Sequence, residues 1–225
     1  MCSRYSLTSP PEAVRSYFGA MVREEFPPRY NIAPTQPVHI VRNDPKGQRE
    51  LVLVRWGLVP SWVKEPGEFS TILNARAETA AEKPSFRASL RHRRCLVPTD
   101  GFYEWTGDKG EKQPHLVRRK GGGLFAMAGL WEHWIGADGS EIETMAILTV
   151  AANATVRPIH DRMPAIVTPD AFDFWLDTRS GKADLAMAVL QPARAGLLEV
   201  VPVSRKLNNP RNEGPELQQP PPPTR

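Results

Sequence analysis

Apolar residues in this chain fall mostly in short runs that either alternate with polar residues or are continuous, and proline, glycine, asparagine or aspartate separates the runs. This pattern is typical of β-strands bounded by turns. Strands are therefore predicted at 38–43, 49–62, 94–105, 115–119, 124–134, 143–152 and 198–204, with the segment 94–105 turning once in its middle and the segment 70–79 extended.

Helical spacing of apolar residues is confined to a few short segments. The first helix is predicted over 9–22, with Ser9 as its N-cap and Pro10 at the first helical position, where a missing N–H costs nothing. Shorter helices are predicted within the basic segment 83–94 and over 168–177. Helices are thus few and short beside the strands.

The glycines at 121–123 predict a tight turn, and therefore a hairpin between the strands 115–119 and 124–134. Many short strands with a few helices favour the α+β class, as a single domain around a curved, mostly antiparallel, barrel-like β-sheet with short flanking helices. This domain is expected to span residues 1–216. The Pro/Gln-rich segment 217–225 has no apolar face to bury and is predicted to be a disordered tail.

Composition narrows the class of protein further. The chain has 225 residues, of which 40% are hydrophobic, enough for one well-packed core, and its net charge of +4 only mildly favours a polyanionic partner. Two cysteines cannot form a disulfide framework, no signal peptide is evident, and no apolar run could span a bilayer. We expect a cytoplasmic protein without a membrane segment, and the histidine and cysteine spacing predicts no metal site.

The most unusual candidate for chemistry is Cys2, directly behind the initiator methionine. If Met1 is removed, Cys2 carries an α-amine and a thiol on adjacent carbons, a 1,2-aminothiol that no internal cysteine offers. Without further support, a cysteine at this position is most often incidental. Cys95 lies within a predicted strand and is interpreted as a core residue.

Three other segments combine polar residues in suggestive ways. Asn74 and Arg76 alternate with Glu78 and would share one face of an extended segment. Glu104 lies between two aromatic residues, which would raise its pKa by desolvation, and His160 lies in a proline-bounded loop. Each residue alone has an ordinary structural interpretation: a turn amide, an ion pair and a hydrogen-bonded histidine.

The order of these segments resembles a known family. The strings MCSRY, YNIAPTQ, RWGLVPSW, NARAET, RRCLVPTDGFYEW, AGLWEHW, IHDRMP and NNPRNEGPE follow the order of the SRAP (SOS response-associated peptidase) domain, whose members are also called abasic-site processing proteins. The resemblance runs from residue 2 to about residue 216. One departure is Ser3, where the family usually has glycine; a positive φ at this position would strain a serine.

The resemblance implies a sensor of abasic sites in the response to DNA damage. After Met1 is lost, by self-cleavage or through an aminopeptidase, the Cys2 amine would form a Schiff base with the ring-opened deoxyribose. The thiol would then close a thiazolidine, giving a reversible covalent protein–DNA crosslink that protects the lesion. The implied partner is single-stranded DNA; no cofactor and no metal are expected, and a monomer is adequate.

The resemblance also implies site residues. The catalytic group would consist of Cys2, with Asn74 orienting it, Glu104 moving protons and His160 protonating the sugar oxygen or stabilising charge. The DNA-binding residues would be three arginines for phosphates and two tryptophans for the strand or the pocket wall: Arg4, Arg76, Arg162, Trp62 and Trp105. Core packing is the rival interpretation of both tryptophans.

Alternatives from other classes stay open at this point. Class II glutamine amidotransferases also use an N-terminal cysteine, but their longer glycine-rich opening is missing here, and a thiol peptidase acting on other proteins would need partners that are not evident around Cys95. The basic and aromatic segments would also suit a module that binds single-stranded DNA without covalent chemistry.

Overall fold

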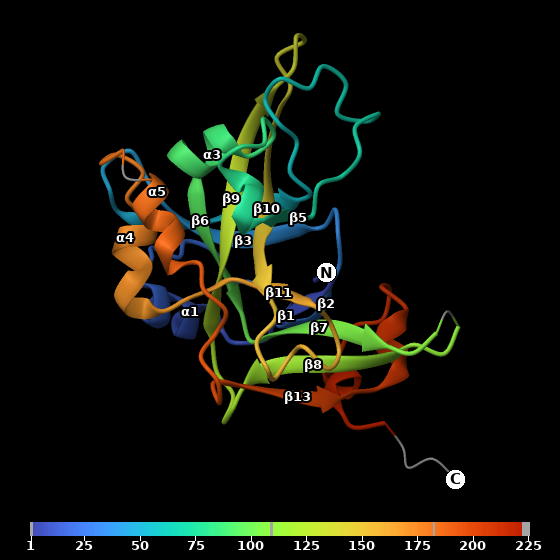
Figure 1. Cartoon of the computed structure of the whole chain (residues 1–225). Coiled ribbons are helices and arrows are strands. Elements are labelled where there is room, and N and C mark those ends of the chain that lie inside the picture. Colours follow the sequence, from blue (N-terminus) through green and yellow to red (C-terminus); the bar gives the residue numbers. More distant parts are fainter. Residues whose placement is uncertain (1, 109, 182, 222–225) are drawn as a thin grey trace.

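The structure is a computed structural model that describes residues 2–108, 110–181 and 183–221. The strands in this part of the chain are β1 (Tyr5–Leu7), β2 (Arg29–Ile32), β3 (Pro37–Asn43), β4 (Arg49–Trp56), β5 (Asn74–Arg76), β6 (Arg94–Thr99), β7 (Gly101–Thr106), β8 (Gln113–Arg119), β9 (Phe125–Ile135), β10 (Glu141–Ala151), β11 (Arg162–Pro164), β12 (Ile166–Val167) and β13 (Leu198–Pro202). The α-helices are α1 (Pro11–Phe18), α2 (Ala77–Ala80), α3 (Arg87–His92), α4 (Phe172–Leu176) and α5 (Ala183–Ala186). Figure 1 shows their arrangement.

The larger sheet closes into a barrel. β10 pairs with β4, β4 with β3, β3 with β6, β6 with β9, and β9 returns to β10. Only the β10–β4 contact in this ring is parallel, so the expected α+β fold around a curved, mostly antiparallel sheet is confirmed. β5, β11 and β12 extend the sheet beyond the ring.

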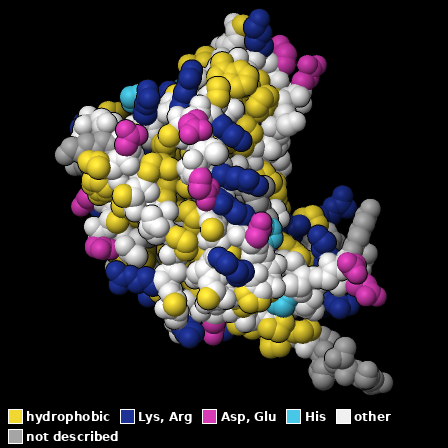
Figure 2. All heavy atoms as spheres, viewed as in Figure 1, with side chains coloured by type: hydrophobic (Ala, Val, Ile, Leu, Met, Phe, Trp, Pro, Cys, Tyr) yellow, Lys and Arg dark blue, Asp and Glu magenta, His cyan; other side chains and the backbone are white. Residues whose placement is uncertain are grey.

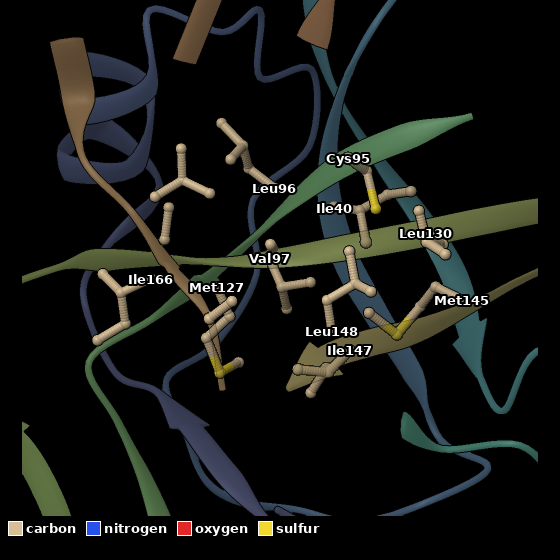
Figure 3. Packing of buried hydrophobic residues seen from close by; sticks show 14 of the residues in the cluster. Ile40, Cys95, Leu96, Val97, Met127, Leu130, Met145, Ile147, Leu148 and Ile166 are labelled. Atoms are coloured by element: carbon tan, nitrogen blue, oxygen red, sulfur yellow. The ribbon is translucent and has the colours of Figure 1, made fainter. Parts of the chain in front are cut away.

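Branched and sulfur-containing side chains of the barrel strands pack into its core. Figure 3 shows the tight contact of residues that are almost entirely shielded from solvent: Ile40, Cys95, Leu96, Val97, Met127, Leu130, Met145, Ile147, Leu148 and Ile166. Each fully buried aliphatic side chain contributes about 1.5–3 kcal/mol through removal of apolar surface from water. The interpretation of Cys95 as a core residue is confirmed.

A second, antiparallel sheet has the order β13-β8-β7-β1-β2 and lies across one end of the long barrel strands (Figure 1). The chain passes from β6 in the barrel directly into β7 in this sheet through Asp100. The carboxylate of Asp100 accepts hydrogen bonds from the backbone N–H of Thr8 and Ser9 and from the Ser9 hydroxyl. This crossing fixes the N-terminal strand β1 beside β7.

The first helix is shorter than the pattern predicts, and the prediction of Ser9 as its N-cap was wrong. Helix α1 begins at Pro11, so Pro10 occupies the N-cap position, and the Ser9 hydroxyl binds Asp100 instead of the helix. The helix ends before Gly19, whose φ of 58° lies in the left-handed region that glycine adopts without steric cost. A tertiary contact therefore overrides the local capping signal.

The predicted hairpin around the glycines at 121–123 was also wrong. β8 pairs with β7 and β13 in the second sheet, whereas β9 pairs with β6, β10 and β12 in the larger sheet. All three glycines have positive φ, and the Gly122 N–H closes a turn by donating to the Arg119 carbonyl at 2.9 Å, but this turn carries the chain between two sheets. Local sequence indicates a turn without indicating which partner each flanking strand takes.

Other predicted elements are confirmed with shifted ends. The strand predicted over 49–62 stops at Trp56, because Gly57 adopts a φ of 135°. The helix within 83–94 is α3, and the segment 168–177 forms a 3₁₀ turn followed by α4. The extended segment 70–79 is a strand only over β5, after which α2 begins.

The predicted domain end at residue 216 falls inside a 3₁₀ helix, Pro215–Gln218. Leu217 is fully buried against the second sheet, and the Gln218 amide donates hydrogen bonds to the hydroxyls of Ser6 and Tyr103. The prediction of a disordered tail was therefore wrong for residues 217 and 218, and residues 222–225 lie outside the described part of the chain. Within that part, every helix is too short or too polar to reach across a lipid bilayer.

Candidate functional site

Cys2 lies immediately before β1 and is completely shielded from solvent. Its thiol donates a hydrogen bond to the Arg4 carbonyl, with a Sγ···O distance of 3.5 Å. The Tyr103 N–H donates to the same carbonyl at 3.0 Å, which ties this end of the chain to β7. The N-terminal segment is thus held against the second sheet, while Met1 lies outside the described residues.

Asn74 connects Cys2 to the larger sheet. β5 runs parallel to β10 with Asn74 opposite Ile147, and from there the Asn74 amide donates a hydrogen bond of 2.9 Å to the Cys2 carbonyl. The predicted pairing of Asn74 with Cys2 is therefore present in the structure. Because the bond fixes the backbone of Cys2, it restricts where both its nitrogen and its sulfur can point.

Glu104 belongs to β7 and faces the interior together with Phe102, because alternate residues of a strand share a face. Its side chain is almost fully buried, and this burial raises the pKa of Glu104, while the charge of His160 opposes the rise. Burial also raises the pKa of the Cys2 thiol, and the charge of Glu104 adds to that rise. Glu104 is thus within electrostatic reach of both Cys2 and His160.

His160 lies in the loop between β10 and β11. Its Nδ1 atom is 2.9 Å from the Asp161 carboxylate and accepts a hydrogen bond of 2.9 Å from the backbone N–H of Arg162. The Ala152 N–H donates to the Asp161 carbonyl at 2.9 Å and closes the loop. Hydrogen bonds as well as the flanking Pro158 and Pro164 therefore restrict the motion of this loop.

Two of the predicted DNA-binding arginines lie on the two strands that pair with the C-terminal half of β10. Arg76 ends β5 and is exposed, whereas Arg162 begins β11, and its guanidinium binds both carboxylate oxygens of Glu78 at 2.6 and 2.8 Å. The same guanidinium donates to the carbonyl of Thr149 at 2.5 Å. In this part of the molecule, Figure 2 shows Lys and Arg side chains running down the middle of the face in view, with acidic side chains among them.

Arg4 and Trp105 lie on the other side of β7 from Glu104. The Arg4 guanidinium donates to the Asn31 side chain at 2.7 Å and to the Leu207 carbonyl at 3.2 Å, and it lies 5.8 Å from the centre of the Trp105 ring. Burial lowers the pKa of Arg4. These residues line an open depression of about 450 Å³ together with Ser3, Gly110, Lys112 and Asn208.

Trp105 lines this depression, and its ring also packs against the buried cluster around Tyr103 and Leu207. Contact of Trp105 with DNA stays a prediction. Ser3 is partly buried, and among the described residues Thr35 is the only non-glycine residue with a positive φ. Serine at position 3 is therefore not strained by the backbone conformation.

Trp62 lies in the long connection between β4 and β5, before Asn74 and Arg76 in the chain. Its side chain is 57% exposed and contacts the ring of Phe69 edge-on at 5.8 Å. It takes no part in the hydrogen bonds of Cys2, Asn74 and His160 given above. A core role for Trp62 is therefore wrong, and contact with DNA stays a prediction.

Sequence reasoning did not anticipate two groups beside the site. Thr149 binds Arg162 through its carbonyl and its hydroxyl, and Glu78, which was expected only to share a face with Asn74, is the ion-pair partner of Arg162. Neither contact had a signal in the sequence, because β10 and β11 meet only in the folded chain. Within the described residues, no three His, Cys, Asp or Glu side chains gather as a metal ion would require.

Comparisons with known proteins agree with the fold and identify the family. The model of the family "SOS response associated peptidase (SRAP)" matches residues 1–210. The abasic site processing protein YoqW of Bacillus subtilis is 39% identical over 221 residues, covering 96% of this chain and 98% of the relative. The abasic site processing protein HMCES of Xenopus tropicalis is 34% identical, covering 86% of this chain and 66% of the relative. A crystal structure of a protein from Bacteroides thetaiotaomicron superposes with a TM-score of 0.86 at 27% identity, covering 97% and 99% of the two chains.

Proposed function

Since this chain belongs to the SOS response associated peptidase (SRAP) family, we propose that it processes abasic sites in DNA by covalent attachment through Cys2. The observation that carries the proposal is the setting of Cys2. It is buried, its carbonyl is bound by Asn74, and it lies within electrostatic reach of Glu104. A cysteine that was incidental at this position would not need this set of polar neighbours.

The first step is attack by nitrogen. Removal of Met1 exposes the α-amine of Cys2, whose ordinary pKa of about 7.7–8.0 leaves a nucleophilic fraction near neutral pH. The raised pKa of the buried thiol keeps sulfur protonated in the resting protein, so sulfur does not compete for the aldehyde. The amine adds to the C1′ aldehyde of the ring-opened abasic sugar, and loss of water gives a Schiff base.

The second step is closure by sulfur. The Cys2 sulfur adds to the imine carbon while the thiol proton is transferred to the imine nitrogen, which forms a five-membered thiazolidine without cleaving the strand. Closure is intramolecular, so a high effective molarity favours it. The hydrogen bond from Asn74 to the Cys2 carbonyl limits the motion of the residue during both steps.

Glu104 and His160 supply proton transfers in this proposal. Burial raises the pKa of Glu104, which brings it closer to the pH at which a carboxyl group can both give and take a proton. Glu104 relays protons during imine formation, ring closure and reversal. His160, held through Nδ1 by its loop, acts on the sugar oxygen or on charge that develops beside it.

Arg4, Arg76 and Arg162 are assigned to backbone phosphates, which position the strand without reading its sequence. Trp62 and Trp105 are assigned to the strand or to the wall of its groove. Single-stranded DNA is the proposed substrate, because stacking in a duplex opposes entry of the sugar aldehyde into a buried site.

The test is a denaturing gel of the purified protein with an abasic oligonucleotide, and the intact mass of the same preparation shows whether Met1 is absent. A shifted band is expected with the abasic single strand, weaker with a duplex and missing with intact DNA. Cys2→Ala should abolish the band, and Glu104→Gln should slow its formation. Retention of Met1, or equal binding of intact and abasic strands with no stable band, would overturn the proposal in favour of a noncovalent DNA-binding module.

A further inference from the structure

Arg162, one of the three arginines assigned to DNA phosphates, forms an ion pair with the carboxylate of Glu78. Both terminal nitrogens of Arg162 bind the two carboxylate oxygens of Glu78, at 2.6 and 2.8 Å. Such a paired geometry is the one in which arginine also grips a phosphate. In the DNA-free protein, therefore, the phosphate-binding edge of Arg162 is already in use.

The two members of this ion pair differ in how firmly they are held. The Arg162 side chain is only 13% exposed and stays anchored through the carbonyl and hydroxyl of Thr149, at 2.5 and 3.2 Å. The Glu78 side chain is 51% exposed. Glu78 can therefore swing into solvent while Arg162 keeps its position.

Glu78 also lies within electrostatic reach of Arg76, the arginine at the end of β5. Its pKa is lowered first by the hydrogen bonds from Arg162, and the charge of Arg76 adds to this effect. The negative charge of Glu78 is thus paired with Arg162 and acts more weakly on Arg76, and both arginines are assigned to the DNA backbone. A phosphate bridging Arg76 and Arg162 would occupy the same electrostatic position.

We propose that Glu78 stands in for a backbone phosphate in the DNA-free protein and competes with the DNA strand for Arg162. The inference rests on the proposed function, because it uses the assignment of Arg162 to a phosphate. Binding of a strand displaces the Glu78 carboxylate from Arg162. The free energy needed to break this ion pair lowers the net affinity of Arg162 for DNA. Glu78 thereby weakens the hold on intact strands, and lesion-bearing strands are retained through the covalent step at Cys2.

The test measures the noncovalent affinity of the full chain for an intact single-stranded oligonucleotide by fluorescence anisotropy. Glu78→Gln removes the charge and keeps the shape, and Glu82→Gln, an exposed residue just beyond α2, is the matched control for the loss of one negative charge. Glu78→Gln should tighten binding by about 1.5-fold to fivefold beyond the control, the fold-change that corresponds to the measured strength of a single exposed ion pair.

Salt dependence gives an independent readout. Each phosphate newly neutralised by a protein cation steepens the slope of log affinity against log salt by about 0.7 for single strands. Glu78→Gln frees Arg162 for this role, so its slope should steepen by about that amount, whereas the slope of Glu82→Gln should match the unmodified protein. With the neutral replacements Arg162→Ala or Arg162→Gln, the added effect of Glu78→Gln should vanish.

Weaker binding by Glu78→Gln would show that Glu78 positions Arg162 for DNA, and affinity equal to the Glu82→Gln control would show no competition; either result overturns the inference. A gain that persists without Arg162 would do the same. The covalent assay reads the proposed function separately: loss of the Cys2-dependent band in the unmodified protein defeats that function, whereas a normal band with unchanged Glu78→Gln affinity defeats only the competition.

Discussion

Replacement of Glu104 by glutamine should slow the proposed reaction and yet stabilise the fold at neutral pH. The carboxyl group lies on β7 with 4% of its surface exposed, so ionisation removes a charge from water. The pKa is raised because this burial outweighs the favourable charge of His160. Glutamine keeps nearly the same shape and never ionises, so it avoids the cost of the buried charge.

The sign of the pH dependence follows from the raised pKa. Below the ordinary pKa of about 4.3, Glu104 is protonated in both folded and unfolded chains, and burial costs nothing. As pH rises through the folded pKa, the native state must ionise a buried group that the unfolded chain ionised earlier, so the contribution of Glu104 to stability is lost. The advantage of Glu104→Gln should therefore be near zero at about pH 4 and largest at about pH 7–8.

The magnitude follows from the cost of an incompletely compensated buried charge. Because each unit of pKa corresponds to about 1.4 kcal/mol, we expect a gain on the order of 1 kcal/mol, which for a chain of this size raises the melting temperature by roughly 2–4 °C. Urea denaturation at several pH values measures this gain, and Glu111→Gln, an exposed position between β7 and β8, serves as the flat control. Equal or lower stability of Glu104→Gln at neutral pH would refute the reasoning, because the ionised carboxylate would then be stabilised by its surroundings.

Three further predictions test the site and the fold. Asn74→Ala should slow formation of the Cys2 adduct by about 3–10-fold in a gel time course, because it removes one hydrogen bond worth about 1 kcal/mol; an unchanged rate would remove this residue from the mechanism. Burial lowers the pKa of His39 to about 4, so the free energy of unfolding should fall as pH drops from about 6.5 towards 4. His39→Gln should flatten that decline in urea titrations, and a parallel decline in both proteins would contradict this prediction. Gly129→Ala should lower the free energy of unfolding by about 1–3 kcal/mol, because its new Cβ would lie 2.8 Å from the Cys95 sulfur. A double variant with Cys95→Ala should lose less stability than the sum of the two single changes, and strict additivity would exclude the clash.

The candidate site could be predicted only as a set of residues. Cys2, Asn74, Glu104 and His160 come from four separate segments, and their motifs in order pointed to one family. The partner of Arg162 could not be foreseen, because Glu78 lies in helix α2 instead of the predicted extended segment and is far from Arg162 in the chain. The face on which Trp105 lies, opposite Glu104, follows from strand alternation, but what covers that face depends on the C-terminal segment.

The sequence by itself determined the strand-rich character of this chain, the approximate positions of its elements and the family motifs, because alternation, turn residues and short motifs are properties of neighbouring residues. The tertiary structure alone decided that β8 and β9 belong to different sheets, that the Ser9 hydroxyl donates to Asp100 instead of capping the helix, and that Leu217 is buried. It also decided that Glu104 is buried and that Arg162 forms an ion pair with Glu78. Strand pairing, burial and electrostatic partners depend on residues far apart in the chain, and only the folded chain brings those residues together.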